Sequence, residues 1–353
     1  MKIGAVAAIG ILGVSLLAST RAATVTLSVE AESGSLAGKA ATVAAASASG
    51  GSAVTFGGGA AGGTGAVSCD QAGIQKLVDS VSATTIEANL RKLVQDDSKP
   101  TPNESISRHV SSPGNKIKTD WARQQYVSYG LEDASQQFSS GGYSLTNVVG
   151  RLAGSDPNTL YAVSGHIDSI SQSPKTVAPG AEDDGSGTVA AMEAGRVLKA
   201  FQPCMKASLD FVGFNDEEEN MNGSPAYINA VKSKTFKGMY NLDMVGYTPN
   251  GECFINFYNS NTRDKPLYEK VGSVNTKYNI GMKSSNQSYN SDDVDAWQFW
   301  NKNLPSVYGA DCATDSYPDY HKTSDSVKNI NFTQMAKVTK LMVASLAELS
   351  LGQ

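Results

Sequence analysis

Four carboxylates stand almost together at the end of one apolar run in this chain. Residues 211–214 read FVGF, which is typical of a buried strand, and one residue later come Asp216, Glu217, Glu218 and Glu219. Mutual repulsion would force some of these groups to take up protons unless a cation offsets their charge. The pattern therefore predicts a cation site at the mouth of the core.

Other ligands for such a cation occur at further strand and loop ends. His166 follows an apolar strand candidate, and His321 lies in a polar loop before the last predicted helix. More carboxylates close other candidate strands and loops: Asp183, Asp184 and Asp243. The third histidine, His109, has no acidic neighbour in the sequence, and we expect it to be structural or to line the rim.

The composition of this ligand set indicates which ion would bind. Neutral imidazole with several carboxylates suits zinc or a similar ion better than calcium. The four cysteines show no CxxC spacing, so a cysteine zinc site is not expected. There are more carboxylates than one tetrahedral zinc needs, which favours two ions about 3.5 to 4 Å apart that share one aspartate and a bridging water.

Alternating strands and helices must position these side chains. Apolar residues recur at helical spacing from about residue 70 to 94, again over 187–201, and over 332–349, where Asn331 is the expected N-cap. Strands are predicted at 160–164, 209–214, 239–242, 254–258 and 306–308. The alternation predicts an α/β fold with a mixed, largely parallel central sheet flanked by helices, whose sites gather at the carboxyl ends of the strands.

The N-terminal part has a different composition. Residues 1–22 place one lysine before an apolar stretch and small residues, as in a secretory signal peptide, so we expect the protein to be secreted. Residues 23–68 are rich in Ala, Gly and Ser and are expected to form a small β-element and linker. Two stretches within 24–66 resemble the opening of carbohydrate-binding β-sandwiches, so a weak cell-wall or glycan contact is an alternative to a plain tether.

Charge and cysteine content narrow the class of protein further. A net charge of −5 gives no electrostatic footprint for nucleic acid. No segment after the signal is long and apolar enough to span a bilayer, so no membrane span is expected. Four cysteines in an exported chain allow two disulfides with three possible pairings.

Five motifs carry a family resemblance: SGHIDS, APGAEDDGSGT, NDEEENMNGS, NLDMVGY and YHKTSDS. In this order and at these intervals they resemble the secreted, leucine-type di-zinc aminopeptidases of peptidase family M28, over about residues 69–353. The resemblance implies a zinc-exopeptidase domain (phosphorylase/hydrolase-like) at 69–353. It also implies hydrolysis of N-terminal, apolar residues from peptides with a free N-terminus.

The resemblance also implies a role for each matching residue. Two Zn²⁺ would be bridged by Asp183 and a water, with His166 and Asp243 on one ion and Glu218 and His321 on the other.

Three further residues match the motifs without being ligands. Glu217 would be the general base, and Tyr320 would support the oxyanion of the tetrahedral intermediate. Asp168 would accept the second N–H of His166 and fix its tautomer.

Other functions share this fold and remain open. An M28-type carboxypeptidase or dipeptidase, or a glutaminyl cyclase with one zinc, would use similar ligands. A noncatalytic surface-binding protein is a weaker alternative, because a closed structural zinc site needs no unligated glutamate such as Glu217. One loop departs from the family pattern: in QSYNSDDVDAW, Asp293 stands where relatives have a histidine, while Asp292 keeps the matching aspartate.

Overall fold

The computed structural model describes residues 67–352, apart from 96, 100–103 and 260, together with four short strands nearer the N-terminus. The chain divides into two compact units, Met1–Thr64 and Gly65–Gln353. In the first unit, β1 (Val14–Ser15) pairs with β2 (Ser28–Val29) and β3 (Ala40–Ala44) with β4 (Ser52–Phe56), both antiparallel. The rest of the expected signal peptide (1–22) and the rest of the 23–68 segment up to residue 66, including its expected glycan contact, lie outside the described residues.

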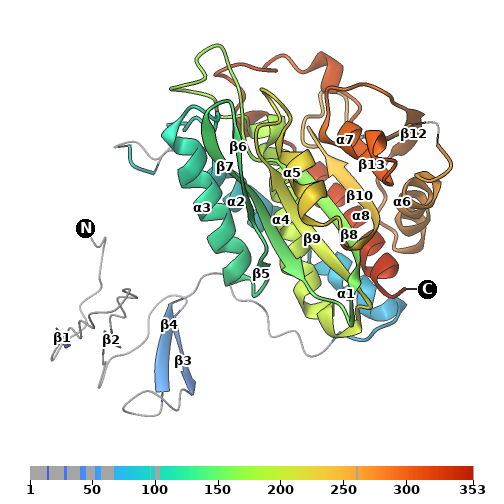
Figure 1. Cartoon of the computed structure of the whole chain (residues 1–353). Coiled ribbons are helices and arrows are strands. Elements are labelled where there is room, and N and C mark those ends of the chain that lie inside the picture. Colours follow the sequence, from blue (N-terminus) through green and yellow to red (C-terminus); the bar gives the residue numbers. More distant parts are fainter. Residues whose placement is uncertain are drawn as a thin grey trace. The chain divides into compact units, whose positions relative to one another are not determined.

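A nine-stranded sheet forms the centre of the second unit (Figure 1). Its strands are β5 (Glu132–Asp133), β6 (Gln136–Ser140), β7 (Tyr143–Leu152), β8 (Asp156–His166), β9 (Ala207–Phe214), β10 (Thr235–Leu242), β11 (Phe254–Tyr258), β12 (Ser284–Ser288) and β13 (Ser306–Asp311). Their order is β12-β11-β13-β10-β8-β9-β7-β5, with β6 paired to β7. The four central strands, β13, β10, β8 and β9, are mutually parallel, whereas β7 and β11 join them antiparallel. This arrangement confirms the mixed, largely parallel sheet.

Eight helices complete the described part of this unit: α1 (Gln71–Ser80), α2 (Ala83–Val94), α3 (Pro113–Ser128), α4 (Gly187–Leu198), α5 (Gly223–Ala230), α6 (Lys265–Lys277), α7 (Asp295–Asn301) and α8 (Phe332–Ser350). Short 3-10 turns occupy Lys199–Cys204, Thr314–Ser316 and Val327–Asn329. Asn331 caps α8 by accepting hydrogen bonds from the amides of Thr333 and Gln334, as expected of that residue type.

Helices cover both faces of the sheet, and the central strands are apolar on both sides for that reason. Along β10, Tyr240 packs into the larger core with α1, α2, α4, α6 and α8, while its neighbour Met239 packs into a second core with α5 and α7. Adjacent strand residues point to opposite faces, so a strand buried on both sides loses the apolar–polar alternation of a half-exposed one. All eight residues of β9 are buried.

Two disulfides settle the pairing that the sequence left open. Cys69 is bonded to Cys204, and Cys253 to Cys312. The first joins the segment before α1 to the turn after α4, and the second joins the segment before β11 to the one after β13. Among the described helices, none has the length and apolar character needed to cross a membrane.

Candidate metal centre

Three neighbouring parallel strands deliver side chains to one edge of the sheet. His166 is the last residue of β8, Asp243 directly follows β10, and Glu217 comes three residues after β9 ends. Since β10, β8 and β9 are adjacent and parallel, their carboxyl ends meet. Glu217, a member of the acidic quartet, therefore lies beside His166, as the place of the quartet after an apolar strand predicted.

His166 faces three carboxylates. Its Nε2 lies 3.1 Å from Asp183 Oδ1, 3.7 Å from Asp243 Oδ1 and 4.0 Å from Glu217 Oε2. The imidazole is almost fully buried, with 2% of its side chain exposed. One nitrogen thus points into a cluster of oxygens that water barely reaches.

The second histidine faces the other side of the same cluster. His321 Nε2 lies 3.2 Å from Asp183 Oδ2 and 3.0 Å from Glu218 Oε2. Asp183 therefore presents one carboxylate oxygen to each histidine. His321 is more open than His166, with 38% of its side chain exposed.

Tyr320 lies at the open side of the cluster. Its ring stacks on the imidazole of His321, with centroids 3.8 Å apart and an interplanar angle of 20°. Tyr320 is 49% exposed, so its hydroxyl is within reach of a molecule that enters from solvent. Burial of the ring and the nearby carboxylates, Asp183 first, raise the pKa of this phenol, which keeps it protonated as a donor.

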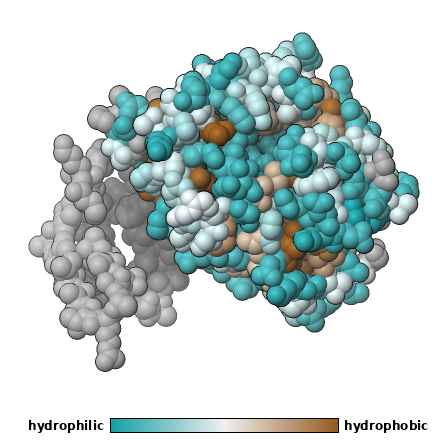
Figure 2. Space-filling model, turned by 45° about the horizontal axis from the view of Figure 1, so that its top comes forward, coloured by the Kyte–Doolittle hydropathy of each residue, from teal (hydrophilic) through white to brown (hydrophobic). Residues whose placement is uncertain are grey.

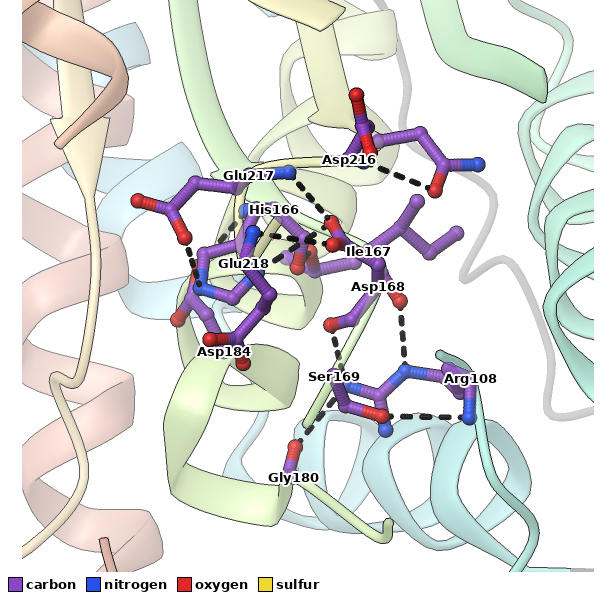
Figure 3. A network of polar contacts seen from close by, with 12 residues as sticks. Arg108, His166, Ile167, Asp168, Ser169, Gly180, Asp184, Asp216, Glu217 and Glu218 are labelled. Carbon is purple, nitrogen blue, oxygen red and sulfur yellow. Dashed lines mark hydrogen bonds and ion pairs between the residues drawn. The ribbon is translucent and has the colours of Figure 1, made fainter. Parts of the chain in front are cut away.

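Asp168 holds the loop that carries the two glutamates. Its carboxylate oxygens accept the backbone N–H groups of Glu217 and Glu218, each at 3.2 Å (Figure 3). Its distance to His166 Nδ1 is 3.7 Å, longer than a hydrogen bond. This is an ion-pair distance, so the hydrogen bond expected to fix the His166 tautomer stays a prediction, and the buried Nδ1 makes no other hydrogen bond with the described residues.

The remaining members of the acidic quartet turn away from the cluster. Glu219 Oε1 lies 2.7 Å from Nε2 of His109, which is buried and had no acidic neighbour in the sequence. Asp216 is buried, accepts a hydrogen bond from Asn220 and, in Figure 3, lies apart from Glu217 and Glu218. Glu219 therefore has a histidine partner, and Asp216 a contact within its own loop.

Two carboxylates support the cluster through backbone contacts that the sequence did not predict. Asp184 accepts N–H groups from the backbone of His166, Gly187 and Met244, at 2.9, 2.7 and 3.2 Å. Asp325 accepts the amide of Asp183 at 3.1 Å. Both lie inside the motifs DDGSG and KTSDS, but a sequence alone does not show that a carboxylate accepts backbone amides.

Asp295 was also missed, and the sequence pointed to its neighbours instead. It is buried at the start of α7, and neither of its oxygens forms a hydrogen bond. Burial raises its pKa to about 7. Asp292 and Asp293, which drew attention in the sequence, are both exposed.

Without a cation, this cluster cannot keep all its carboxylates ionised. Burial and the neighbouring Asp183 raise the pKa of Glu218 to about 8, and burial raises that of Asp243 to about 7. Burial also raises the pKa of Glu217 well above its ordinary value. Burial opposes protonation of His321, yet hydrogen bonds with Asp183 and Glu218 raise its pKa to about 10. The positive charge of one or two bound divalent ions would lower the pKa values of these groups again.

The donor set fits such ions. His166, Asp183 and Glu218 place one ligand atom each within 4.8 Å of one another, and so do His166, Asp184 and Asp243. In the second group Asp184 is committed to three backbone amides, so Asp183, whose two oxygens face the two histidines, is the better candidate ligand. Imidazole nitrogen with carboxylate oxygen is a donor set typical of zinc.

Backbone strain is concentrated at the same loops. His321 and Met244, the residue after Asp243, adopt φ angles of 54° and 58°. Non-glycine residues rarely occupy this left-handed region, and when they do they often lie at functional sites.

Comparison with known proteins places the chain in a family. A family model described as Peptidase family M28 matches residues 147–346, more than half of the chain. A probable zinc metalloprotease of Pyrenophora tritici-repentis is 32% identical over 192 residues, which are 49% of this chain and 39% of that protein. A probable leucine aminopeptidase of Trichophyton verrucosum is 26% identical over 291 residues, covering 78% of this chain and 76% of that protein. The chain spans only between 39% and 54% of the length of the first four curated relatives it matches.

Solved structures share the fold. The LapA aminopeptidase of Legionella pneumophila superposes with a TM-score of 0.65 at 21% identity, covering 78% of this chain and 73% of that one. A glutaminyl cyclase of Bacteroides thetaiotaomicron, bound to N-acetylhistamine, gives a TM-score of 0.60 at 15% identity, over 77% of this chain and 98% of that one. Because both identities are low, these structures establish the fold alone. On the strength of the family model, the chain belongs to peptidase family M28.

Proposed function

We propose that this protein is a di-zinc aminopeptidase that hydrolyses the N-terminal residue from peptides. The observation that carries the proposal is the position of Asp183, whose two oxygens face His166 and His321 at 3.1 and 3.2 Å. A carboxylate held between two imidazoles is suited to bridge two ions. His166, Asp183 and Asp243 would hold one zinc, and Asp183, Glu218 and His321 the other.

Glu217 is the proposed general base. Its Oε2 lies 4.0 Å from His166 Nε2, so it borders the ligand cluster, and burial raises its pKa. Two zinc ions bound here would supply Lewis acidity that polarises the scissile carbonyl and acidifies a water. Glu217 would take a proton from the attacking water and then donate it to the departing amine. Asp168 holds Glu217 in place through its backbone amide.

Tyr320 is suited to stabilise the transition state, and its exposed side is the side from which a peptide would enter. The phenol would donate a hydrogen bond to the oxygen that becomes negatively charged in the transition state. His321 and Tyr320 are the most exposed members of the site, so a peptide would approach from their side. Figure 2, in which the top of Figure 1 comes forward, shows a mainly hydrophilic surface with scattered hydrophobic spots. A preference for apolar N-terminal residues rests on the resemblance to leucine-type enzymes.

We also infer that the protein works outside the cell. The pairing of all four cysteines into two disulfides supports export, because such bonds persist in oxidising compartments. The sequence of residues 1–22 supports the same inference. Expression of the full chain, followed by mass analysis of the protein in the medium, would show both bonds and the cleavage site; retention in the cytoplasm with free thiols would contradict it.

The activity is tested with a panel of aminoacyl p-nitroanilides and their N-acetylated counterparts. We expect cleavage only of substrates with a free amine, loss of cleavage on chelation, and its recovery when zinc is added back. Peptides with N-terminal glutamine and peptides with free C-termini are assayed in parallel. Ammonia release without hydrolysis would favour a cyclase, and release of the C-terminal residue a carboxypeptidase, and either would overturn the proposal.

A further inference from the structure

Two ligand-bearing segments meet beneath the proposed metal centre. Residues 167–169 follow His166, and residues 178–180 lead into Asp183. The separation of these segments decides how far apart the His166 imidazole and the Asp183 carboxylate lie, and therefore whether both can hold one ion.

Arg108 lies between the two segments and donates hydrogen bonds to both (Figure 3). Its Nε donates to the carbonyl of Ile167 at 2.7 Å, and its Nη2 to those of Gly180 at 3.0 Å and Asp168 at 3.5 Å. Its Nη1 donates to the carbonyl of Pro179. The planar fork of a guanidinium suits this use, because its donors keep fixed directions.

The side chain of Arg108 is a buried cation held by carbonyls. It is 0% exposed, and within the described part of the chain it forms no ion pair with a carboxylate. Burial lowers its pKa, while nearby carboxylates, Asp325 and Asp168 first, oppose that shift. A desolvated charge is expensive for a fold to keep. Arg108 lies near carboxylates of the metal centre, so a role at that centre would explain why the fold contains this buried charge.

Other contacts tie the same two segments together. Ser169 Oγ donates to the carbonyl of Ala178 at 2.7 Å and accepts the amide of Arg108 at 3.2 Å. Gly180 adopts a φ of 52°, and a Cβ there would lie 2.6 Å from Ser169 Cβ and 3.2 Å from Arg108 Nη2. The turn is therefore closed around the guanidinium and leaves no room for a larger residue.

We propose that Arg108 is a positioning residue for the metal centre, which fixes the separation of His166 and Asp183 before any ion binds. The inference rests on the proposed function, because it takes the two residues as ligands of one ion. Arg108 touches neither ion nor substrate in this scheme. It acts by holding the segments that carry His166 and Asp183 in one arrangement with and without zinc, so that zinc binding does not have to order them.

The test compares zinc affinity with stability in matched variants. Zinc affinity is measured by competition with a chromophoric chelator, and unfolding by denaturant is measured with and without zinc. We expect Arg108→Met to weaken zinc binding by about 10- to 100-fold, the range seen when groups behind metal ligands are removed. Arg108→Lys keeps the charge but not the fork and should fall between Arg108→Met and wild type.

Two more variants separate positioning from general destabilisation. Ser169→Ala removes the hydrogen bond to the carbonyl of Ala178 but keeps Arg108, so it should weaken zinc binding less than Arg108→Met does. Arg151→Met removes a partly buried arginine that pairs with Asp210, four residues before the end of β9. It should lower stability equally with and without zinc and leave zinc affinity unchanged.

Each outcome decides the question. If Arg108→Met lowers the stability of the zinc-free and zinc-loaded protein equally and leaves affinity unchanged, Arg108 is merely structural and the inference is wrong. If that variant does not fold, unchanged affinity in both Arg108→Lys and Ser169→Ala overturns it. If wild type binds no zinc at all, the proposed function fails first, and the inference falls with it.

Discussion

The neighbouring carboxylates of Asp183 and Asp184 face different partners. Asp183 lies between the imidazoles of His166 and His321, whereas Asp184 accepts three backbone N–H groups, including that of His166. Asp183 is the proposed bridging ligand, whereas Asp184 holds the backbone of His166 and of the residue after Asp243.

This difference predicts that an Asp→Asn substitution affects zinc binding at one position and stability at the other. Asp183→Asn should abolish tight zinc binding, because it removes the carboxylate that faces both His166 and His321. Asp184→Asn should destabilise the zinc-free protein by about 1 to 3 kcal/mol, because three amides lose a charged acceptor. Zinc content and denaturant unfolding of both variants check this. Equal zinc loss with equal destabilisation would contradict it.

Tyr320→Phe should lower kcat and leave KM nearly unchanged. The phenol is proposed to donate only to the transition-state oxyanion, and removal of such a donor costs about 2.7 to 4 kcal/mol, or roughly 100- to 1,000-fold in kcat. Steady-state kinetics on the preferred aminoacyl p-nitroanilide measure both constants. Tyr143→Phe, at an exposed tyrosine at the start of β7, is the control. Full kcat in Tyr320→Phe would remove this residue from the mechanism.

Zinc binding should release protons at pH 7. In the zinc-free protein the pKa of Glu218 is raised to about 8 and that of His321 to about 10, so both hold a proton at pH 7. Both must lose it to bind an ion, and so must His166, where burial opposes protonation yet Glu217 and other carboxylates raise the pKa well above its ordinary value. More than two protons should therefore leave, and affinity should rise with pH. Calorimetric titration at pH 7 in two buffers of different ionisation enthalpy counts these protons. An enthalpy that does not depend on the buffer would contradict the prediction.

Glu348 should stabilise the fold only above acidic pH. It joins α8 to α6 by accepting hydrogen bonds from Lys270 at 2.7 Å, Lys277 at 2.8 Å and Tyr278 at 2.8 Å. Burial alone would raise its pKa, but these donors lower it to about 2. Because the folded pKa lies below the unfolded value of about 4.3, the stabilisation is complete above that pH and is lost as the pH falls toward 2.

The matched variant for this effect is Glu348→Gln. At pH 7 it should unfold with a free energy about 1 to 3 kcal/mol lower than wild type, and the difference should shrink steadily below pH 4.3. Urea unfolding across this range measures it. A difference that stays constant down to pH 2 would mean that the carboxylate charge contributes nothing.

Sequence reasoning captured the elements whose burial pattern is strongest. The helices that bury Ile74 and Leu90, the helix after Asp183 and the five predicted strands are all present, because each has a continuous apolar face or run. β7 was missed because its first residues are exposed and polar, and β12 because all five of its residues are exposed. A strand at the edge of a sheet pairs through its backbone, which the side-chain pattern does not reveal.

The residues of the candidate site also differ in whether the sequence could predict their roles. The residues that gather around Asp183 follow apolar runs or lie in polar loops, and their types alone indicate a cation. Arg108, Asp184 and Asp325 act through backbone carbonyls and amides of distant segments. Such contacts depend on the folded path of the chain, so neither spacing nor residue type could predict them.

The most direct test of the account is the zinc content and activity of Glu217→Gln beside wild type. Zinc per chain is measured by atomic emission after gel filtration, and the cleavage of a free-amine aminoacyl p-nitroanilide is measured on the same samples. The account predicts two zinc ions in both proteins and a loss of about 100- to 10,000-fold in kcat for the variant alone. A variant that loses zinc would make Glu217 a ligand, and one that retains full activity would remove the general base on which the mechanism depends.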